Sequence, residues 1–220
     1  MCGRYVCSKA PEVYGSFYDV IVPPIAPNFN VAPTHNVPVV RTGDGKRECV
    51  LQRWGLIPSW ATDKKALLIN ARADTVATKP AFRTAFKKRR CLILADGYYE
   101  WKRVGKTRQP YLFRLKSDEP FAFAGLWETW HGEGPPIESC AIITTEANEL
   151  GRVVHDRMPV ILLRDSAEAW LDPGVAGGEA LQTLLRPLAA QEMVSYPVSI
   201  RVGKISENDP ALIEPATLER

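Results

Sequence analysis

The first residues, Met1-Cys2-Gly3, offer the most distinctive chemistry in the sequence. If Met1 is removed, Cys2 carries a thiol and a free α-amine on adjacent carbons. An α-amine has a pKa of about 7.7–8.0 and a thiol one of about 8.5, so both groups are partly reactive near neutral pH. The amine can attack an aldehyde to form an imine, and the thiol can then close a five-membered thiazolidine ring. In an arbitrary chain, a cysteine here is more often a small residue that follows the first Met, so the hypothesis needs support from other residues.

Glu100 is a candidate for the proton transfers that such a reaction requires. It lies in the strand-like segment 96–102, where alternation places it on the same face as Tyr98 and Lys102. Its immediate neighbours are aromatic, and a carboxylate near aromatic walls is partly desolvated, which raises its pKa and suits proton transfer. An exposed Glu100 that pairs with Lys102 fits the same pattern.

Two further polar residues stand where local propensity does not explain them. His155 follows a predicted helix and precedes Asp156-Arg157, and Asn70 begins the segment 70–75. A lone histidine is more often a surface or capping residue, and asparagine commonly forms turns. Neither residue is specific for a function by itself.

The hydrophobic pattern predicts the elements that must position these residues. Short helices are expected at 8–19 with Ser8 as N-cap, at 78–90 with Thr78 as N-cap, at 147–153, at 166–171 with Asp165 as N-cap, and at 179–190. Strands are expected at 37–42 and 48–54 as a hairpin, then at 91–95, 98–104, 111–116, 121–128, 137–144, 159–163 and 194–202. Short loops between consecutive strands favour antiparallel pairing. We therefore predict an α+β fold with a curved, largely antiparallel β-sheet or barrel-like core and peripheral helices.

Length and composition indicate an ordinary globular protein. The 220 residues are 45% hydrophobic and 24% charged, which suits one domain over residues 1–220, with a core at about 2–205 and a peripheral C-terminal tail. The five cysteines contain no CxxC and the chain has three histidines, so we expect neither a disulfide framework nor a metal site. No apolar run reaches the length of a membrane span and no charged leader precedes the domain. We therefore expect no membrane contact and a cytoplasmic location, nucleoid-associated in a bacterium.

Charge is distributed unevenly although the net charge is only +3. The segment Lys87-Lys88-Arg89-Arg90 is a run of four cations. Such a run is commonly a solvated helix end, favourable against the helix macrodipole, and it also suits the phosphates of a nucleic acid. Trp54 and Trp60 flank a Gly/Pro loop, where tryptophan either fills the core or stacks on unpaired bases.

The polar candidates belong to motifs that occur in a defined order. These are Met-Cys-Gly-Arg at 1–4, Asn-Val-Ala-Pro at 30–33, Arg-Trp-Gly-Leu-Ile-Pro at 53–58, Ile-Asn-Ala-Arg-Ala-Asp-Thr at 69–75, Ala-Asp-Gly-Tyr-Tyr-Glu-Trp at 95–101, Ile-Ile-Thr-Thr-Glu-Ala-Asn at 142–148 and His-Asp-Arg-Met-Pro at 155–159. Together they resemble the SOS response-associated peptidase (SRAP) family, from residue 2 to about residue 205. Met158 departs from some relatives, which have a basic residue there.

The resemblance implies a protein that senses abasic sites in single-stranded DNA and crosslinks itself to them after Met1 is removed. It implies that Cys2 is the nucleophile, that Asn70 positions its α-amine, that Glu100 is the general acid/base and that His155 assists ring opening and crosslink reversal. It further implies phosphate or active-site contacts by Arg4 and Arg72, and a DNA channel shaped by Pro33, Trp54, Trp101 and Thr144. No cofactor or metal is implied, and we expect a monomer that shields the lesion during the DNA damage response.

The same chemistry predicts accessory activities. An imine at C1′ acidifies the neighbouring carbon, so β-elimination of the 3′ phosphate, a lyase side activity, is expected. The peptidase label of the family requires no more than an autoproteolytic type of cleavage that removes Met1.

Two other classes of function compete with this interpretation. Glutamine amidotransferases of the N-terminal-nucleophile class also begin Met-Cys-Gly, with the amine as base for the thiol. The present chain has no Arg-Trp-Ala-Thr run and no matching glycine-rich loop downstream. The other alternative is a non-catalytic module that binds single-stranded DNA, for which the basic run is sufficient.

Overall fold

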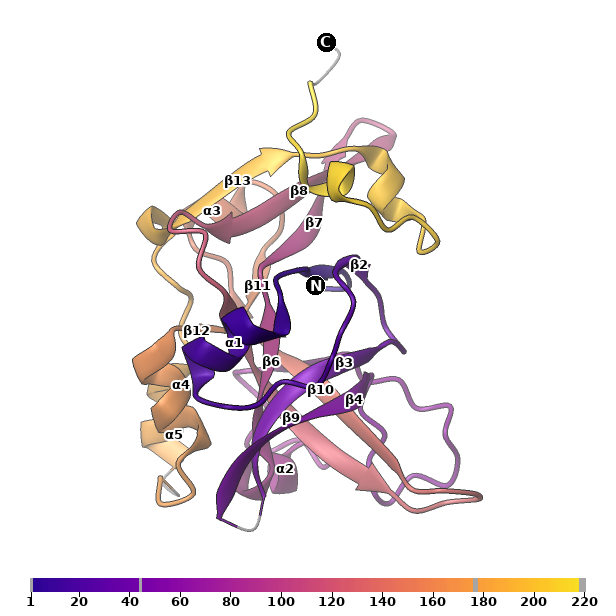
Figure 1. The fold of residues 1–220 in the computed structure, drawn as a ribbon, viewed down its shortest axis with the longest axis vertical. Coiled ribbons are helices and arrows are strands. Elements are labelled where there is room, and N and C mark those ends of the chain that lie inside the picture. The colour runs from indigo at the N-terminus through magenta and orange to yellow at the C-terminus, as the bar shows by residue number, and fades with distance from the viewer. Residues whose placement is uncertain (1, 44, 176–177, 218–220) are drawn as a thin grey trace.

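Two β-sheets carry most of the regular structure in the computed structural model, which describes residues 2–43, 45–175 and 178–217 (Figure 1). The upper sheet in Figure 1 has the order β13-β8-β7-β1-β2, and the lower one has the order β11-β10-β4-β3-β6-β9-β12 with β5 beside β10. The strands are β1 (Tyr5–Cys7), β2 (Asn28–Val31), β3 (Asn36–Gly43), β4 (Lys46–Trp54), β5 (Asn70–Arg72), β6 (Arg90–Ala95), β7 (Gly97–Val104), β8 (Thr107–Leu115), β9 (Phe121–Trp130), β10 (Ile137–Glu146), β11 (Arg157–Pro159), β12 (Ile161–Leu162) and β13 (Met193–Pro197).

The lower sheet closes on itself, which confirms the barrel-like core. Strand β10 pairs in antiparallel fashion with β9 and in parallel fashion with β4, so β10, β4, β3, β6 and β9 form a ring. Most other pairings are antiparallel, as the short connections predict. Closure requires close approach at Gly125 of β9, where a Cβ atom would lie 2.9 Å from the Cys91 Sγ atom and from Ile93. Only glycine fits there without displacing the neighbouring strand.

Aromatic side chains fill the ring and the space between the two sheets. The rings of Tyr5 and Trp54 meet edge to face at 5.2 Å, and Tyr5 meets Phe123 at 5.4 Å. All three side chains are fully buried. The geometry is the one that aromatic quadrupoles favour, so this cluster both fills the core and fixes β1 against the ring.

All the helices except α4 are shorter than the sequence pattern predicts. They are α1 (Pro11–Tyr18), α2 (Arg83–Lys88), α3 (Glu149–Arg152), α4 (Arg164–Leu171) and α5 (Gly178–Leu184), with 3₁₀ turns at Ala190–Glu192, Ile200–Gly203 and Pro210–Ile213. The helix expected to continue to residue 190 ends at Leu184, and the strand expected to continue to residue 202 ends at Pro197. Among the described residues, no helix is long and apolar enough to cross a membrane.

None of the three expected N-caps caps its helix, and for Ser8 and Thr78 the reason is that the side chain hydrogen-bonds elsewhere. Ser8 donates to the Asp96 carboxylate, and α1 begins after Ala10 with Pro11 in its first turn. Thr78 donates to the Thr75 carbonyl in a series of turns that precedes α2. Helix α4 begins at Arg164, two residues before the expected start, so Asp165 lies in its first turn instead of capping it.

The C-terminal segment, expected as a peripheral tail, packs on the upper sheet. Leu212 is fully buried in a second apolar cluster with Tyr99 and Leu112. Tyr99 and Trp101 face this cluster, whereas Tyr98 faces the main core. The alternation predicted for β7 is therefore confirmed, and it places Glu100 on the core side.

Candidate functional site

The candidate site lies where the two sheets meet. Cys2 and Glu100 belong to the upper sheet, on the approach to β1 and on β7, and Asn70 and His155 belong to the lower sheet, on β5 and immediately before β11. Pairing of Tyr5 with Tyr98, together with the 3.0 Å bond from the Tyr99 N–H to the Arg4 carbonyl, sets the local register. If this antiparallel register continues by one residue beyond Arg4 and Tyr99, Gly3 lies opposite Glu100, so the start of the chain is level with Glu100.

Asn70 joins Cys2 to the lower sheet. Its Nδ2 donates to the Cys2 carbonyl at 2.8 Å. Its Oδ1 is buried and has no hydrogen-bond partner among the described residues. Strand β5 holds Asn70 through parallel pairing with β10, where Ile142 is level with Asn70. An acceptor that is buried without a donor is costly, so Asn70 is suited to hold an amine or ammonium near Cys2.

Glu100 is 4% exposed, so the exposed pairing with Lys102 that the sequence permitted is wrong. Burial raises the pKa of the Glu100 carboxyl above its ordinary value, and the nearby charge of His155 counteracts part of this effect. Cys2 is fully buried, and burial together with the Glu100 charge raises the pKa of its thiol. Glu100 therefore lies close enough to Cys2 and to His155 to interact electrostatically with each of them.

His155 is held by its own loop. Its Nδ1 accepts from the Arg157 N–H at 3.0 Å, and Asp156 Oδ1 lies 2.9 Å from the same nitrogen. One nitrogen cannot accept from an N–H and donate to a carboxylate at once, so protonation of the ring would exchange the first contact for the second. Both contacts lie within the loop and fix the orientation of the imidazole ring.

Two of the expected DNA contacts are buried in the protein. Trp54 has no exposed surface, and its Nε1 donates to the Ile69 carbonyl at 3.0 Å, so it cannot stack on a base. Thr144 is also fully buried, and it accepts from Arg157. Trp54 lies where β4 pairs with β10 to close the ring, and Thr144 lies further along β10, between β5 and β11.

Arg4 is likewise directed into the protein. It is 9% exposed, and its Nη1 donates to Asn30 Oδ1 and to the Val202 carbonyl, each at 2.9 Å. Asn30 in turn donates to the carbonyls of Lys204 and Glu207. Arg4 therefore ties the start of the chain to the C-terminal segment, a structural contact that the sequence did not indicate.

The remaining expected contacts have accessible surface. Arg72 has a side chain that is 57% exposed and pairs with Asp74 at 2.8 Å. Trp101 is half-buried against the second apolar cluster. Pro33 is half-buried in a turn where Thr34 has a φ of 78°, a left-handed conformation unusual for a β-branched residue.

Sequence reasoning missed Arg157 as a site residue and left the role of Trp60 open. Trp60 is 66% exposed on the loop that precedes β5, so of the two tryptophans that flank the Gly/Pro loop it is the one that can contact a base. Arg157 lies near Arg72, whose like charge together with burial lowers the pKa of the Arg157 guanidinium, and its Nε is buried without a partner among the described residues. Arg157 stands in the same motif as His155, and that position was the available signal.

A cavity of about 600 Å³ lies beside His155 and contains this arginine pair. Its charged lining residues are Arg72, Asp74, Glu146, Arg152, Asp156, Arg157 and Arg186. The four guanidiniums of this lining outnumber its three carboxylates, so the cavity carries a net positive charge that suits an anion.

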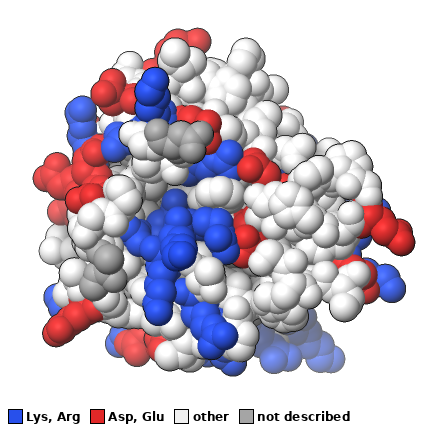
Figure 2. Space-filling view, turned by 90° about the horizontal axis from the view of Figure 1, so that it is seen from below, with Lys and Arg blue, Asp and Glu red and all other residues white. Residues whose placement is uncertain are grey.

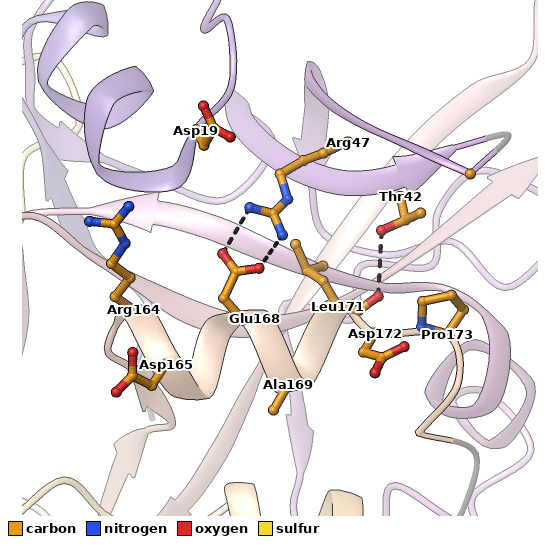
Figure 3. A pocket seen from close by; sticks show the side chains of 11 residues that line it. Asp19, Thr42, Arg47, Arg164, Asp165, Glu168, Ala169, Leu171, Asp172 and Pro173 are labelled. Atoms are coloured by element: carbon orange, nitrogen blue, oxygen red, sulfur yellow. Dashed lines mark hydrogen bonds and ion pairs between the residues drawn. The ribbon is translucent and has the colours of Figure 1, made fainter.

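A larger cavity, of about 860 Å³, is lined by other residues (Figure 3). Arg47 and Glu168 pair across it, and Thr42 donates to the Leu171 carbonyl at its edge. None of the candidate residues lines it. Volume therefore does not identify the site in this protein.

Cysteines and potential metal ligands are dispersed. All five cysteines are free thiols. In the part of the chain that the structure describes, no group of three or more His, Cys, Asp or Glu side chains is arranged to hold a metal ion.

Comparison with known proteins gives consistent results. The family model "SOS response associated peptidase (SRAP)" matches residues 1–205. Abasic site processing protein YoqW of Bacillus subtilis (strain 168) is 44% identical over 97% of this chain and 99% of its own length. Abasic site processing protein YedK of Escherichia coli (strain K12) is 30% identical over 98% and 100%. A crystal structure of a protein from Bacteroides thetaiotaomicron superposes with a TM-score of 0.81 at 30% identity, covering 96% of this chain and 92% of that one.

Proposed function

Because the chain belongs to the SRAP family, we propose that it processes abasic sites in single-stranded DNA by forming a covalent crosslink through Cys2. The names of the relatives support the lesion as substrate. The observation that best supports a crosslink through Cys2 is its environment at the junction of the two sheets. Asn70 hydrogen-bonds to the Cys2 carbonyl, and the charge of Glu100 acts on the Cys2 thiol.

Removal of Met1 is the first step of the proposal. It converts the Cys2 nitrogen from a peptide N–H into an amine, next to a thiol on the adjacent carbon. Asn70 already holds the Cys2 carbonyl, and its unpartnered Oδ1 offers an acceptor for the new amine. Orientation of the amine by this side chain would direct its lone pair at an incoming aldehyde.

Proton transfer is assigned to Glu100 and His155. An abasic deoxyribose is mostly a closed hemiacetal, and protonation of its ring oxygen helps to open it to the aldehyde. The raised pKa of Glu100 keeps its proton available at higher pH than an ordinary carboxyl does. The Cys2 amine then forms a bond to C1′ and water departs, which leaves an imine. The Cys2 sulfur next bonds to C1′, its proton passes to the nitrogen by way of Glu100 or His155, and a thiazolidine results.

A lyase side activity follows from the intermediate. The imine acidifies the C2′ position, so a base there can remove a proton and expel the 3′ phosphate. Ring closure by the thiol removes the imine and suppresses this elimination. The thiol therefore decides between a stable crosslink and strand cleavage.

The DNA is proposed to approach through the cavity beside His155. Arg72 and Arg157 supply charge for a phosphate near the lesion, and Trp60 and Pro33 supply surfaces for unpaired bases. The protein acts as a monomer without a cofactor in this proposal.

The test uses an oligonucleotide with a single abasic site and protein whose intact mass confirms the loss of Met1. Wild-type protein should form an adduct that survives heat and denaturant. Cys2→Ala keeps the amine and loses the thiol, so it should form no durable adduct and should cleave more strand. A durable adduct in undiminished yield from Cys2→Ala would disprove the thiazolidine mechanism.

A further inference from the structure

The basic run separates into two pairs with different roles. Arg89 donates to Glu128 at 2.6 Å, and Arg90 is 8% exposed. Lys87 and Lys88 are exposed, and neither forms an ion pair with any described residue. Only the two lysines are therefore available to a partner.

Arg90 forms hydrogen bonds to backbone carbonyls beneath the two exposed lysines. Its guanidinium donates to five backbone carbonyls, which belong to Phe86, Lys87, Trp170, Asp172 and Val175. These carbonyls come from the ends of α2 and α4 and from the chain after α4, and the C-terminal end of a helix carries partial negative charge. Arg90 neutralises the carbonyls that would otherwise repel an anion from this place.

A cavity of about 360 Å³ lies against this arrangement. The described residues that line it are Thr42, Gly45, Lys87, Lys88, Arg90, Leu171 and Pro173, and those among them that carry charge are all cations. The cavity beside His155, in contrast, contains three carboxylates among its lining residues. The smaller cavity is therefore the more selective for anions.

The positive charge continues along the segment that leads into α2. Lys79, Arg83 and Lys87 are all exposed and are spaced by four residues. The Arg83 N–H donates to the Lys79 carbonyl at 2.8 Å, so the spacing corresponds to successive helical turns of about 5.4 Å each. Figure 2 shows Lys and Arg gathered as one field on the lower face of the molecule, with little Asp or Glu within it.

This face is separate from the crosslinking site. Helix α2 lies at the lower end of the molecule in Figure 1, whereas β7 and the start of the chain lie higher. The residues that line the small cavity include none of the candidate catalytic residues. The basic run is therefore separate from the candidate catalytic residues, and the phosphate contacts that the sequence suggested for it would lie elsewhere on the DNA.

We propose that this lower basic face, formed by Lys79, Arg83, Lys87 and Lys88, binds phosphates of the DNA strand outside the lesion. A row of mobile cations with a preformed anion cavity at its end suits a backbone of repeating negative charges, and it gives no base selectivity. The proposal rests on the proposed DNA binding and is independent of the chemistry at Cys2. The face anchors the protein to DNA while the other end captures the lesion.

The test measures equilibrium binding of a long, undamaged single strand as a function of salt, so no crosslink can form. Lys87→Ala/Lys88→Ala should reduce the steepness of log K against log salt by about 1.4, because each phosphate contact on a single strand contributes about 0.7. Arg103→Ala/Lys106→Ala removes the same charge from an exposed hairpin at the β7–β8 turn and should leave the slope unchanged. A short oligonucleotide that fills only the lesion site should bind both variants equally.

The outcomes separate this proposal from the proposed function. If wild-type protein binds no DNA, the proposed function fails. If wild type binds and the Lys87/Lys88 variant keeps its slope, or if both double variants lose slope equally, the lower basic face is not a DNA anchor. Loss of binding to an acidic polypeptide with an unchanged DNA slope would assign the face to a protein partner and overturn the proposal. Thermal melting of each variant checks that these exposed substitutions leave the fold intact.

Discussion

Glu100 illustrates how one position on a strand acquires its chemistry. Alternation along β7 turns its side chain toward the core side of the strand, the side that Tyr98 also faces. Burial there raises the pKa of the Glu100 carboxyl. The ionised form is therefore disfavoured in the folded protein relative to the unfolded chain. A carboxyl with this property can hold a proton at a pH where ordinary carboxyls have lost it.

Glu100→Gln should separate the catalytic from the structural effect of this carboxyl. The crosslinking rate should fall by about 10²–10⁴-fold, as expected when a positioned acid/base is lost, and the variant should lose the rate dependence on the Glu100 titration. Rates of adduct formation across pH measure both effects.

The same substitution, which should slow crosslinking, should increase the stability of the folded protein at neutral pH. The folded pKa lies above the unfolded value of about 4.3, so Glu100 favours folding below that value and loses this contribution as pH rises through the folded pKa. Relative to wild type, Glu100→Gln should become progressively more stable as pH rises above about 4.3. A difference in melting temperature that declines with pH would contradict the assigned burial effect.

At the scale of elements, Asp96 fixes α1 to the corner between the two sheets. Its carboxylate accepts from the Ser8 and Lys9 N–H groups at 2.5 and 3.1 Å, and from the Tyr14 hydroxyl at 2.6 Å. Asp96 is 4% exposed. These contacts replace the capping role that the sequence suggested for Ser8, and they determine where the chain leaves β1.

Asp96→Ala should lower the free energy of unfolding by about 3 kcal/mol or more, because hydrogen bonds to a charged group contribute about 1.5–3 kcal/mol each. Tyr14→Phe removes only one of these contacts and should cost about 1–2 kcal/mol. Urea denaturation of both variants tests the difference. Equal losses would show that the backbone contacts of Asp96 contribute little.

At the scale of the molecule, the two ends of the chain support each other. Arg4 and Asn30 connect the segment that carries Cys2 to carbonyls of residues 202, 204 and 207. We call these contacts of Arg4 and Asn30 the clamp; it lies beside the upper sheet and orients the start of the chain. The C-terminal segment therefore helps to position Cys2.

Asn30→Ala should slow crosslinking by about tenfold or more, since small misplacement of a reacting group is costly. Asn208→Ala is the matched control, because Asn208 also joins the C-terminal segment to β2, by accepting from the Phe29 N–H at 2.7 Å, yet does not contact Arg4. Single-turnover rates at saturating DNA compare the two, with melting temperatures as the measure of stability. Equal rates in both variants would show that the clamp only stabilises the fold.

Local patterns determined much of the architecture from sequence alone. The hairpin of β3 and β4 and the strands from β6 to β10 follow from alternating apolar residues and short turns, which act between neighbours in the chain. The motifs around Cys2, Asn70, Glu100 and His155 identified the family, and the matching family model confirms it. Helix ends failed as predictions because Ser8 and Thr78 hydrogen-bond to partners outside the expected caps.

Only the tertiary structure decided which side chains are accessible and which meet. Closure of the ring by β10 and β4 buries Trp54 and leaves Trp60 exposed, although both flank one Gly/Pro loop. The same packing divides the basic run, with Arg90 caged by carbonyls and Lys87 and Lys88 left in solvent. Contact between Asn70 and Cys2, 68 residues apart, depends on two sheets that meet across the core. Such long-range contacts arise from burial of the whole apolar surface, and no local pattern encodes which residues that burial will bring together.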